Sequence, residues 1–221
     1  MQICAILITR NNESTIENLV LRCRHVIEPD VFVVDRDSVD DTVQRAIAAG
    51  AMHLDAAQGR ESVVMAALRE VGALGYTHAV VLRASDASHH APEQISRFVN
   101  AAFDNPGGIL IASGHGAATR RLANVIASIS GWRRFEDAAS TFRLYPVEET
   151  LGLGCRESDD HVDTEALVRA SWAGIPTCHI PTAREWDRTA PAAGLSPGFG
   201  LRMLAGMLIR SPRLLWRRLS A

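Results

Sequence analysis

The strongest constraint on the fold is an alternation, through the first half of the chain, of short apolar runs with longer segments of helical periodicity. Parallel sheets with helical crossovers show this alternation, because their strands are buried on both faces and each is followed by a helix. Strands are expected at 3–8, 31–35, 51–54, 79–83 and 108–113. Helices are expected at 14–26, 40–49, 61–74 and 92–103. Ser14 is a candidate N-cap and Pro92 a candidate first-turn proline. The fold class is therefore α/β.

The second half of the chain continues the same domain with less regular elements. The expected elements are a helix at 122–130, a strand at 142–145, a helix at 162–172 and a strand at 177–180. From Thr189 onward, Ala, Pro and Gly indicate a loop before the last helical segment. We expect one domain over 1–190, with a Rossmann-like open, mostly parallel sheet flanked by helices, and a loop with a short basic helical segment over 191–221. Open sheets of this kind bind ligands beyond the carboxyl ends of their strands.

The bulk composition excludes several classes of protein. A chain of 221 residues that is 47% hydrophobic buries a substantial core. With 23 basic and 25 acidic residues the net charge is −2, which predicts no general attraction to nucleic acid. The four cysteines lack the paired spacing of zinc or redox sites, so we expect them to be reduced and structural. No apolar run reaches the roughly 18 residues of a membrane-spanning helix, so a cytoplasmic protein is expected.

The last segment, 199–219, contains five arginines and no acidic residue, interleaved with Leu, Met, Ile and Trp. A basic amphipathic stretch of this kind lies readily on an anionic membrane surface, which predicts a peripheral contact with the inner face of the membrane. The alternative is a terminal helix that packs on the domain, with its Arg stems along apolar surface and a break at Pro212.

Polar residues gather where the first two expected strands end. Thr9, Asn12 and Glu13 follow the first strand, and Asp35 and Asp37 follow the second. Because the carboxyl ends of parallel strands share one edge of a sheet, these side chains are expected to face the same ligand-binding edge. Taken alone, the same residues are also compatible with a solvated turn and an N-cap.

The order of these features resembles the opening of the family 2 glycosyltransferases, which have the GT-A fold. In that family the Asn-Glu turn and the first Asp after the second strand hold the base and ribose of a nucleotide sugar. The resemblance implies that Asp35 accepts a hydrogen bond from the uracil or guanine edge, and its ionised carboxylate strengthens such a bond. Arg36 stands where the family has a second Asp. The nucleotide-binding residues implied are Thr9, Asn12, Glu13, Asp35, Asp37, Gly59 and Arg60.

The family places an Asp-x-Asp motif at the end of its fourth strand, where two carboxylates hold a Mg²⁺ or Mn²⁺ ion on the diphosphate. Aligned from Leu82, Arg83 and Ser85 occupy the acidic positions, whereas aligned back from Pro92, Ser85 and Ala87 occupy them, so the motif is broken in either register. Three outcomes are open. The protein has a shifted metal site that uses Asp86 with His89 or His90, or it is a metal-free transferase in which Arg83 compensates the phosphate charge, or it has lost the activity. The histidines are also compatible with loop residues that bind no metal.

A second stretch, 137–146, reads Asp-Ala-Ala-Ser-Thr-Phe-Arg-Leu-Tyr-Pro and resembles the Asp-x-x-x-Gly-Phe-Arg-x-Tyr segment of the dolichyl-phosphate mannosyltransferase-like branch. In that branch the segment borders the reaction centre, and basic residues hold the acceptor phosphate. The matching basic residues are Arg120, Arg121, Arg143, Arg184 and Arg188. Inverting transfer needs a base unless the acceptor atom is already an anion, and the resemblance implies Asp137 or Glu165 for this role. For Glu165 the alternative is a surface salt bridge with Arg169.

Together these resemblances span roughly residues 3–200 and imply a peripheral glycosyltransferase of cell-envelope polysaccharide or glycolipid biosynthesis. It would pass a sugar from a nucleotide-diphosphate donor to a polyprenyl-phosphate, glycolipid or other phosphate-bearing acceptor. The first alternative is a non-catalytic binding or scaffold protein of the same fold, which the replaced acidic residues favour. A nucleotidyltransferase is the second alternative, and it lacks support because no Gly-rich phosphate loop follows the first strand.

Overall fold

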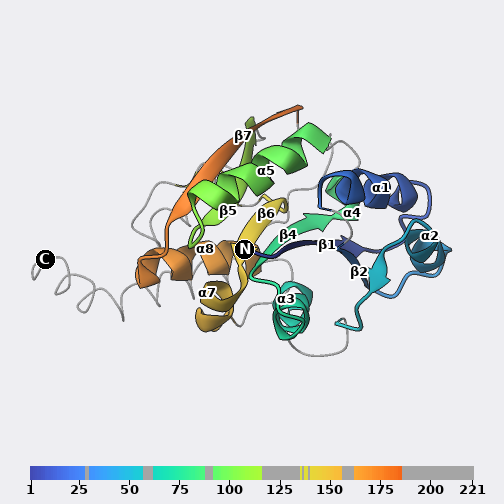
Figure 1. The fold of residues 1–221 in the computed structure, drawn as a ribbon, viewed down its shortest axis with the longest axis horizontal. Coiled ribbons are helices and arrows are strands. Elements are labelled where there is room, and N and C mark those ends of the chain that lie inside the picture. Colours follow the sequence, from blue (N-terminus) through green and yellow to red (C-terminus); the bar gives the residue numbers. More distant parts are fainter. Residues whose placement is uncertain are drawn as a thin grey trace, which may run out of the picture.

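The computed structural model describes residues 1–27, 30–56, 62–87, 92–115, 135, 137–138, 140–155 and 162–185. Within these residues, seven strands form one sheet in the order β3-β2-β1-β4-β6-β5-β7, and helices cover both faces (Figure 1). The strands are β1 (Ile3–Thr9), β2 (Val31–Asp35), β3 (Met52–His53), β4 (His78–Arg83), β5 (Ile109–His115), β6 (Arg143–Pro146) and β7 (Thr177–Glu185). The helices are α1 (Ile16–Val26), α2 (Thr42–Ala48), α3 (Val63–Ala73), α4 (Ala84–Ala87), α5 (Pro92–Asp104), α7 (Val147–Gly152) and α8 (Val162–Ala173).

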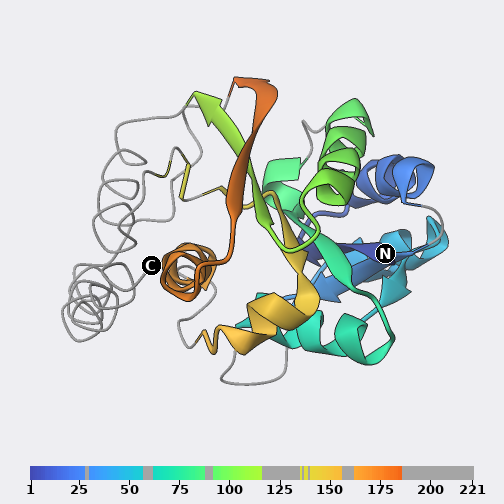
Figure 2. The same cartoon turned by 60° about the vertical axis from the view of Figure 1, so that its left-hand side comes forward.

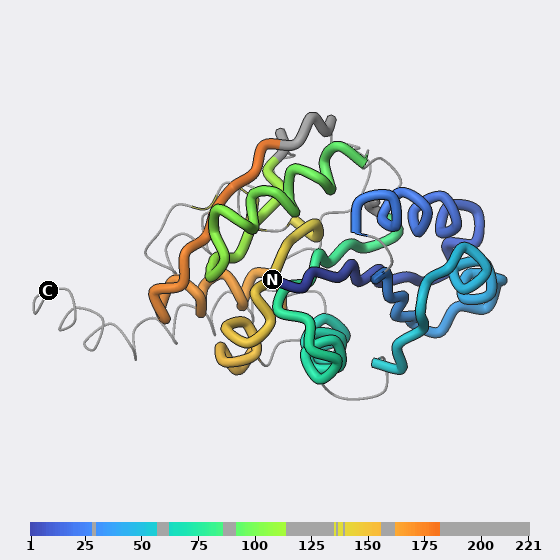
Figure 3. Tube along the Cα trace, viewed as in Figure 1, coloured from blue at the N-terminus to red at the C-terminus, as the bar shows by residue number. Residues whose placement is uncertain are grey.

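Strand β1 lies in the middle of the parallel half of the sheet, and Figure 3 traces the chain from it out to β2 and β3 and back to β4. β1 pairs in parallel with β2, and Thr9 lies opposite Asp35. It also pairs in parallel with β4, and Ile8 lies opposite Arg83. The carboxyl ends of three strands therefore meet at one edge of the sheet.

Two apolar layers hold the helices on the sheet. On one face Cys4, Ile6 and Ile8 of β1 pack in a core with residues of α3, α7 and α8. On the other face Ala5 and Leu7 pack in a core with residues of α1, α2 and α5. The period of two along β1 is the strand period, and burial on both faces explains why its sequence is apolar throughout. Figure 2 shows the two helical layers on either side of the sheet.

Strand β6 interrupts the parallel order. It lies between β4 and β5 and runs antiparallel to both, while β5 pairs in parallel with β7. Along β6, Leu144 joins the core with α1 and α5, whereas Tyr145 joins the core with α3 and α8. The sheet is mostly parallel, as expected, and Arg143 and Tyr145 are the β6 side chains that reach α8.

Most of the expected elements are confirmed within a few residues of their bounds, and α5 begins at Pro92 as expected. The prediction that Ser14 caps α1 is wrong, because Thr15 occupies the N-cap and makes no capping hydrogen bond through its side chain. A side-chain cap does occur at α3, where the Oγ atom of the N-cap Ser62 accepts from the Val64 amide at 3.2 Å. The short helices α4 and α7 were not expected, since four and six residues give too little periodicity to detect.

All four cysteines are free thiols, as expected. Burial raises the pKa of Cys23 to about 12 and that of Cys155 to about 12, so both remain protonated at neutral pH. Among the helices that the structure describes, none combines the length and the apolar character needed to cross a bilayer. The expected helix at 122–130 and the whole segment 191–221 lie outside the described residues.

The stacked rings of Phe98 on α5 and Phe142 before β6 provide a test of the packing. Their centroids lie 4.1 Å apart, and both side chains are buried. We predict that Phe98→Ala lowers the free energy of unfolding by about 3–5 kcal/mol, because it removes buried apolar surface and leaves a cavity. Urea denaturation followed by circular dichroism measures the change. Phe103→Ala on the same helix is the control, since Phe103 is 61% exposed, and an equal loss in both variants would contradict the assignment.

Candidate functional site

The loop after β1 is folded around the side chain of Asn12. The Asn12 Oδ1 atom accepts hydrogen bonds from Thr9 Oγ1 and from the Arg10 amide, both at 3.0 Å. Thr9 is buried, and Asn12 and Glu13 are partly exposed. The expected cluster of Thr9, Asn12 and Glu13 therefore lies at the carboxyl end of β1, with part of it open to solvent.

The loops after β1 and β2 are bound to each other. The Asn11 amide donates to Ser38 Oγ at 2.8 Å, and the Val39 amide donates back to Asn11 Oδ1 at 3.0 Å. Asn11 and Asp37 have positive φ angles of 52° and 56°. Asn and Asp tolerate this left-handed conformation better than other L-residues, which explains their place at the two tight points of the loops.

Asp35 closes the turn that follows β2. Its Oδ2 atom accepts from the Ser38 amide at 2.8 Å, and its Oδ1 atom accepts from Ser38 Oγ at 2.5 Å. The residue is partly exposed, and Asp37 beside it is exposed. A carboxylate has about four lone-pair positions, so these two bonds leave acceptor capacity for a ligand.

Asp40 joins the same two loops at the start of α2. Its carboxylate accepts hydrogen bonds from the amide and hydroxyl of Thr42 and, at 3.3 Å, from the Glu13 amide. Donation by the Thr42 hydroxyl is the largest of the causes that lower the pKa of Asp40. Glu13 in turn accepts from the Asp41 amide through Oε2 at 3.3 Å. In this conformation Glu13 therefore joins the loop after β1 to the loop after β2, which begins at Asp35.

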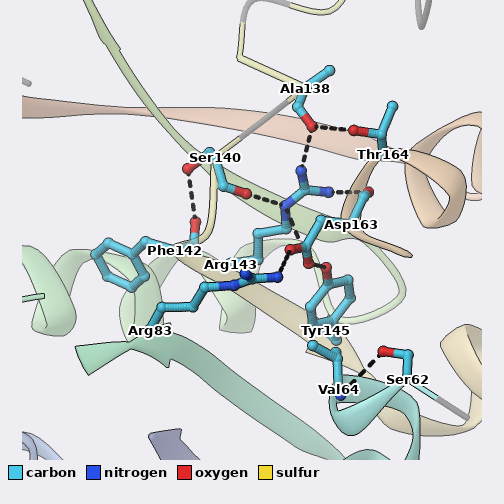
Figure 4. Close-up of polar contacts among 10 residues, drawn as sticks. All are labelled: Ser62, Val64, Arg83, Ala138, Ser140, Phe142, Arg143, Tyr145, Asp163 and Thr164. Atoms are coloured by element: carbon cyan, nitrogen blue, oxygen red, sulfur yellow. Dashed lines mark hydrogen bonds and ion pairs between the residues drawn. The ribbon is translucent and has the colours of Figure 1, made fainter. Parts of the chain in front are cut away.

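The next part of the same edge is a charged cluster around Asp163 in the first turn of α8 (Figure 4). Arg83, the last residue of β4, donates from Nη2 to Asp163 Oδ2 at 3.5 Å. The Tyr145 hydroxyl donates to Asp163 Oδ1 at 2.6 Å. Burial is the largest of the causes that raise the pKa of Tyr145 well above its usual range, so the phenol stays protonated and remains a donor.

Arg143, which was expected to hold an acceptor phosphate, lies in the interior of the protein. Its guanidinium is fully buried, and Nε, Nη1 and Nη2 donate to the main-chain carbonyls of Ser140, Asp163 and Ala138 at 2.7, 2.5 and 2.7 Å. In this conformation Arg143 joins the segment before β6 to the start of α8, and its role towards an acceptor phosphate stays a prediction. A buried charge is tolerated only when it is hydrogen-bonded, and Arg143 satisfies this condition through backbone oxygens.

The two candidate bases, Asp137 and Glu165, are both buried. Glu165 forms the expected i,i+4 ion pair with Arg169 at 2.5 Å, although Glu165 is buried and Arg169 is only partly exposed. Arg169 also donates to the Leu153 carbonyl at 3.2 Å. The structure therefore brings Asp163, not Glu165, to Arg83 at the end of β4, and the role of base stays a prediction for Asp137 and Glu165.

Several predicted site residues cannot be placed with their side chains. Asp86 lies in α4 and Arg184 in β7, but only their backbone is described. The others lie outside the described residues, namely Gly59, Arg60, His89, His90, Arg120, Arg121 and Arg188. Among the side chains that are described, no three of the His, Cys, Asp and Glu type gather closely enough to hold a metal ion.

Sequence reasoning did not identify Asp163 and Tyr145 as members of the site. A signal was present, because Arg143 and Tyr145 are two residues apart on a short strand and therefore share one face. A buried face with a guanidinium and a phenol requires an acceptor opposite it, and Asp163 at the start of α8 supplies one. Asp163 and Glu165 do lie on different sides of α8, as the helical angle of about 200° between them predicts.

A groove of about 640 Å³ lies at the opposite edge of the sheet, where β4 begins. Arg69 and Tyr76, with Glu148 of α7, are among the residues that line it. His78 also lines it, and Nε2 of this histidine is 2.6 Å from the Pro106 carbonyl oxygen. None of the predicted site residues whose side chains the structure describes lines this groove. We therefore take the carboxyl edge of β2, β1 and β4 as the candidate functional site.

Comparison with solved structures relates this arrangement to known proteins. Glucosyl-3-phosphoglycerate synthase from Mycobacterium tuberculosis in complex with uridine diphosphate is 18% identical, with 95% of this chain and 79% of that chain covered and a TM-score of 0.63. The same synthase with Mn²⁺, uridine-diphosphate-glucose and phosphoglyceric acid is 19% identical, with the same coverage and a TM-score of 0.65. A third structure, of a mycobacterial protein, is 17% identical over 95% of this chain and 74% of that chain, with a TM-score of 0.64.

These similarities establish the fold alone, because the sequence identities are low. The expected GT-A type fold, an open and mostly parallel sheet flanked by helices, is confirmed. By sequence, no protein-family model and no curated protein matches the chain. The dolichyl-phosphate mannosyltransferase-like branch stays a prediction.

The structural role of Arg143 can be tested by stability. We predict that Arg143→Met lowers the free energy of unfolding by about 3–5 kcal/mol, because it removes three buried hydrogen bonds to main-chain carbonyls and a positive charge 4.0 Å from Asp163. Urea denaturation provides the measurement. Arg97→Met on the exposed face of α5 is the control, with an expected change within about 0.5 kcal/mol. Equal stability of the two variants would disprove the role.

The lowered pKa of Asp40 predicts a dependence of stability on pH. A carboxyl whose pKa is lower in the folded state contributes stability above its ordinary value of 3.8, and this contribution is lost as the pH falls through the folded value. Asp40→Asn should therefore lose less melting temperature than the natural protein between pH 5 and pH 2, as followed by thermal denaturation. Asp104→Asn, at an exposed site on α5, controls for the removal of one charge. If both proteins lost melting temperature in parallel over this range, the hydrogen-bonded carboxylate would have no such effect.

Proposed function

We propose that this protein transfers a sugar from a nucleotide-diphosphate donor to a phosphate-bearing acceptor at the carboxyl edge of β2, β1 and β4. The observation that supports the proposal most strongly is the joined pair of loops after β1 and β2, at which Asp35 lies opposite Thr9 and the Asn12 amide donates to Thr42 Oγ1. Solved structures of this fold contain uridine diphosphate, uridine-diphosphate-glucose and phosphoglyceric acid.

The donor half of the proposal assigns the nucleotide to the loops after β1 and β2. The Asp35 carboxylate accepts from the base edge, while Thr9 and Asn12 fix the backbone against which the nucleoside lies. Hydrogen bonds to an ionised acceptor are about twice as strong as neutral ones, so Asp35 contributes most to recognition. Gly59 and Arg60 follow β3 in the sequence and serve the diphosphate in this proposal.

The reaction replaces one bond to the anomeric carbon by another. The bond from this carbon to the diphosphate oxygen breaks, and its electron pair leaves with the nucleoside diphosphate. An oxygen of the acceptor forms the new bond on the opposite face, which inverts the configuration. A hydroxyl acceptor gives its proton to a base, Asp137 or Glu165, whereas an acceptor that is already a phosphate anion needs none. Catalysis then rests on positioning and on stabilising the charge of the leaving diphosphate.

A second candidate function is a non-catalytic binding or scaffold protein with this fold. Two observations favour it. Both candidate bases are buried, and Arg83 occupies a position where the resembling enzymes have an acid. A polyprenyl-phosphate or glycolipid acceptor, a peripheral contact of 199–219 with the membrane, and a role in the cell envelope stay predictions.

The donor site can be tested by calorimetry with UDP, GDP and their sugar conjugates. We predict that one of these nucleotides binds and that Asp35→Ala weakens its binding at least tenfold, because a hydrogen bond to a charged group contributes about 1.5–3 kcal/mol. Asp104→Ala, an exposed acid on α5, is the control and should bind as the natural protein does.

Two further outcomes separate the candidate functions. Absence of binding by every nucleotide, with and without Mn²⁺, would refute the transferase and leave a scaffold. Nucleotide binding without release of free sugar or product in the presence of phosphate-bearing acceptors, phosphoglycerate among them, would favour the non-catalytic protein.

A further inference from the structure

The described side chains at the end of β4 do not fit a divalent cation. Hard cations such as Mg²⁺ and Mn²⁺ take oxygen ligands, with carboxylates as their main protein ligands. β4 ends in Arg83, a permanent cation, and Ser85 follows where the second acid of the motif would lie. The described side chains contain no group of three potential ligands. A positive charge is therefore already present at the position for which the resemblance and the Mn²⁺ of similar structures imply a metal.

The register of the sheet places this charge beside the proposed nucleotide site. Arg83 lies opposite Ile8 on β1, and Asp35 lies opposite Thr9 on the other side of the same strand. Neighbouring strands are about 4.8 Å apart, so the backbones of Asp35 and Arg83 are separated by about 10 Å. A base held at Asp35 therefore leaves its diphosphate to extend along the edge towards Arg83.

Asp163 fixes the direction of the Arg83 side chain. The ion pair at 3.5 Å joins the end of β4 to the first turn of α8, and the Tyr145 hydroxyl holds the same carboxylate from the other side. The Arg83 side chain is 17% exposed and the Asp163 side chain 11%, so the pair lies at the boundary between core and solvent. At such a boundary a guanidinium is only partly screened by water, and its planar fork matches phosphate oxygens in pairs.

We infer that Arg83, oriented by Asp163, is the cation that binds the donor diphosphate, and that this protein binds its nucleotide without a divalent metal. The inference rests on the proposed function. Arg83 neutralises part of the charge that gathers on the diphosphate as it leaves, which is the contribution a metal makes in a site with two carboxylates. Asp163 is a positioning residue in this arrangement and touches no ligand atom.

The test is calorimetric titration of UDP, GDP and their sugar conjugates into the full chain, once with excess EDTA and once with Mn²⁺. The natural protein should bind equally in both. Arg83→Gln should bind at least tenfold more weakly in EDTA, because the charge is removed. Arg83→Lys keeps the charge without the fork and should bind with an intermediate affinity. Arg69→Gln, at the opposite edge of the sheet, is the matched control and should bind as the natural protein does.

A double variant should make nucleotide binding depend on a divalent metal. Arg83→Asp combined with Ser85→Asp introduces two acids at the end of β4, and nucleotide binding by this variant should require Mn²⁺. Loss of binding by the natural protein in EDTA would overturn the inference while leaving the proposed function intact, as would unchanged affinity in Arg83→Gln. Absence of nucleotide binding under both conditions would overturn the proposed function and the inference with it. The comparison of the natural protein with and without EDTA decides the question even if a variant at Arg83 fails to fold.

Discussion

The parallel pairing of β1 with both β2 and β4 is the constraint on which the rest of the structure depends. Because each pair is in register at its carboxyl end, the pairing of the backbones brings Asp35, Thr9 and Arg83 to one edge of the sheet. Shifting β1 by one residue would exchange its side chains between the two cores, and each core is packed around the particular residues that it now holds. The core therefore fixes the position of the candidate site.

The second half of the site depends on a different principle, the satisfaction of buried charge. Asp163 accepts from Tyr145 and pairs with Arg83, while its main-chain carbonyl accepts from Arg143. Burying such groups is costly unless each finds a partner, so the cluster determines how β4, β6 and α8 are placed relative to one another. Asp163, which contacts both strands from the start of α8, is thus a structural residue. In our proposal it also positions the Arg83 guanidinium.

Much of the fold followed from sequence periodicity, whereas the site followed only in part. Apolar runs such as 31–35 identify buried strands because both faces of the sheet are covered, and β2 has these bounds. The antiparallel direction of β6 and the short helix α7 depend on contacts distant in the sequence, and no local pattern reports them. Arg143 shows the limit for the site. A motif indicates that a guanidinium is present, but only the surrounding carbonyls decide whether it faces a ligand or the core.

The hydrogen bonds between the loops after β1 and β2 have a consequence for the energetics of recognition. Asn11 and Ser38 each bond to the opposite loop, and Asn11 and Asp37 already occupy the left-handed conformation that their turns require. A ligand that settles on these loops does not have to order them, so little conformational entropy is lost on association. Affinity at this edge then reflects the contacts themselves, and selectivity between similar ligands is set by a surface that does not adapt its shape to each of them.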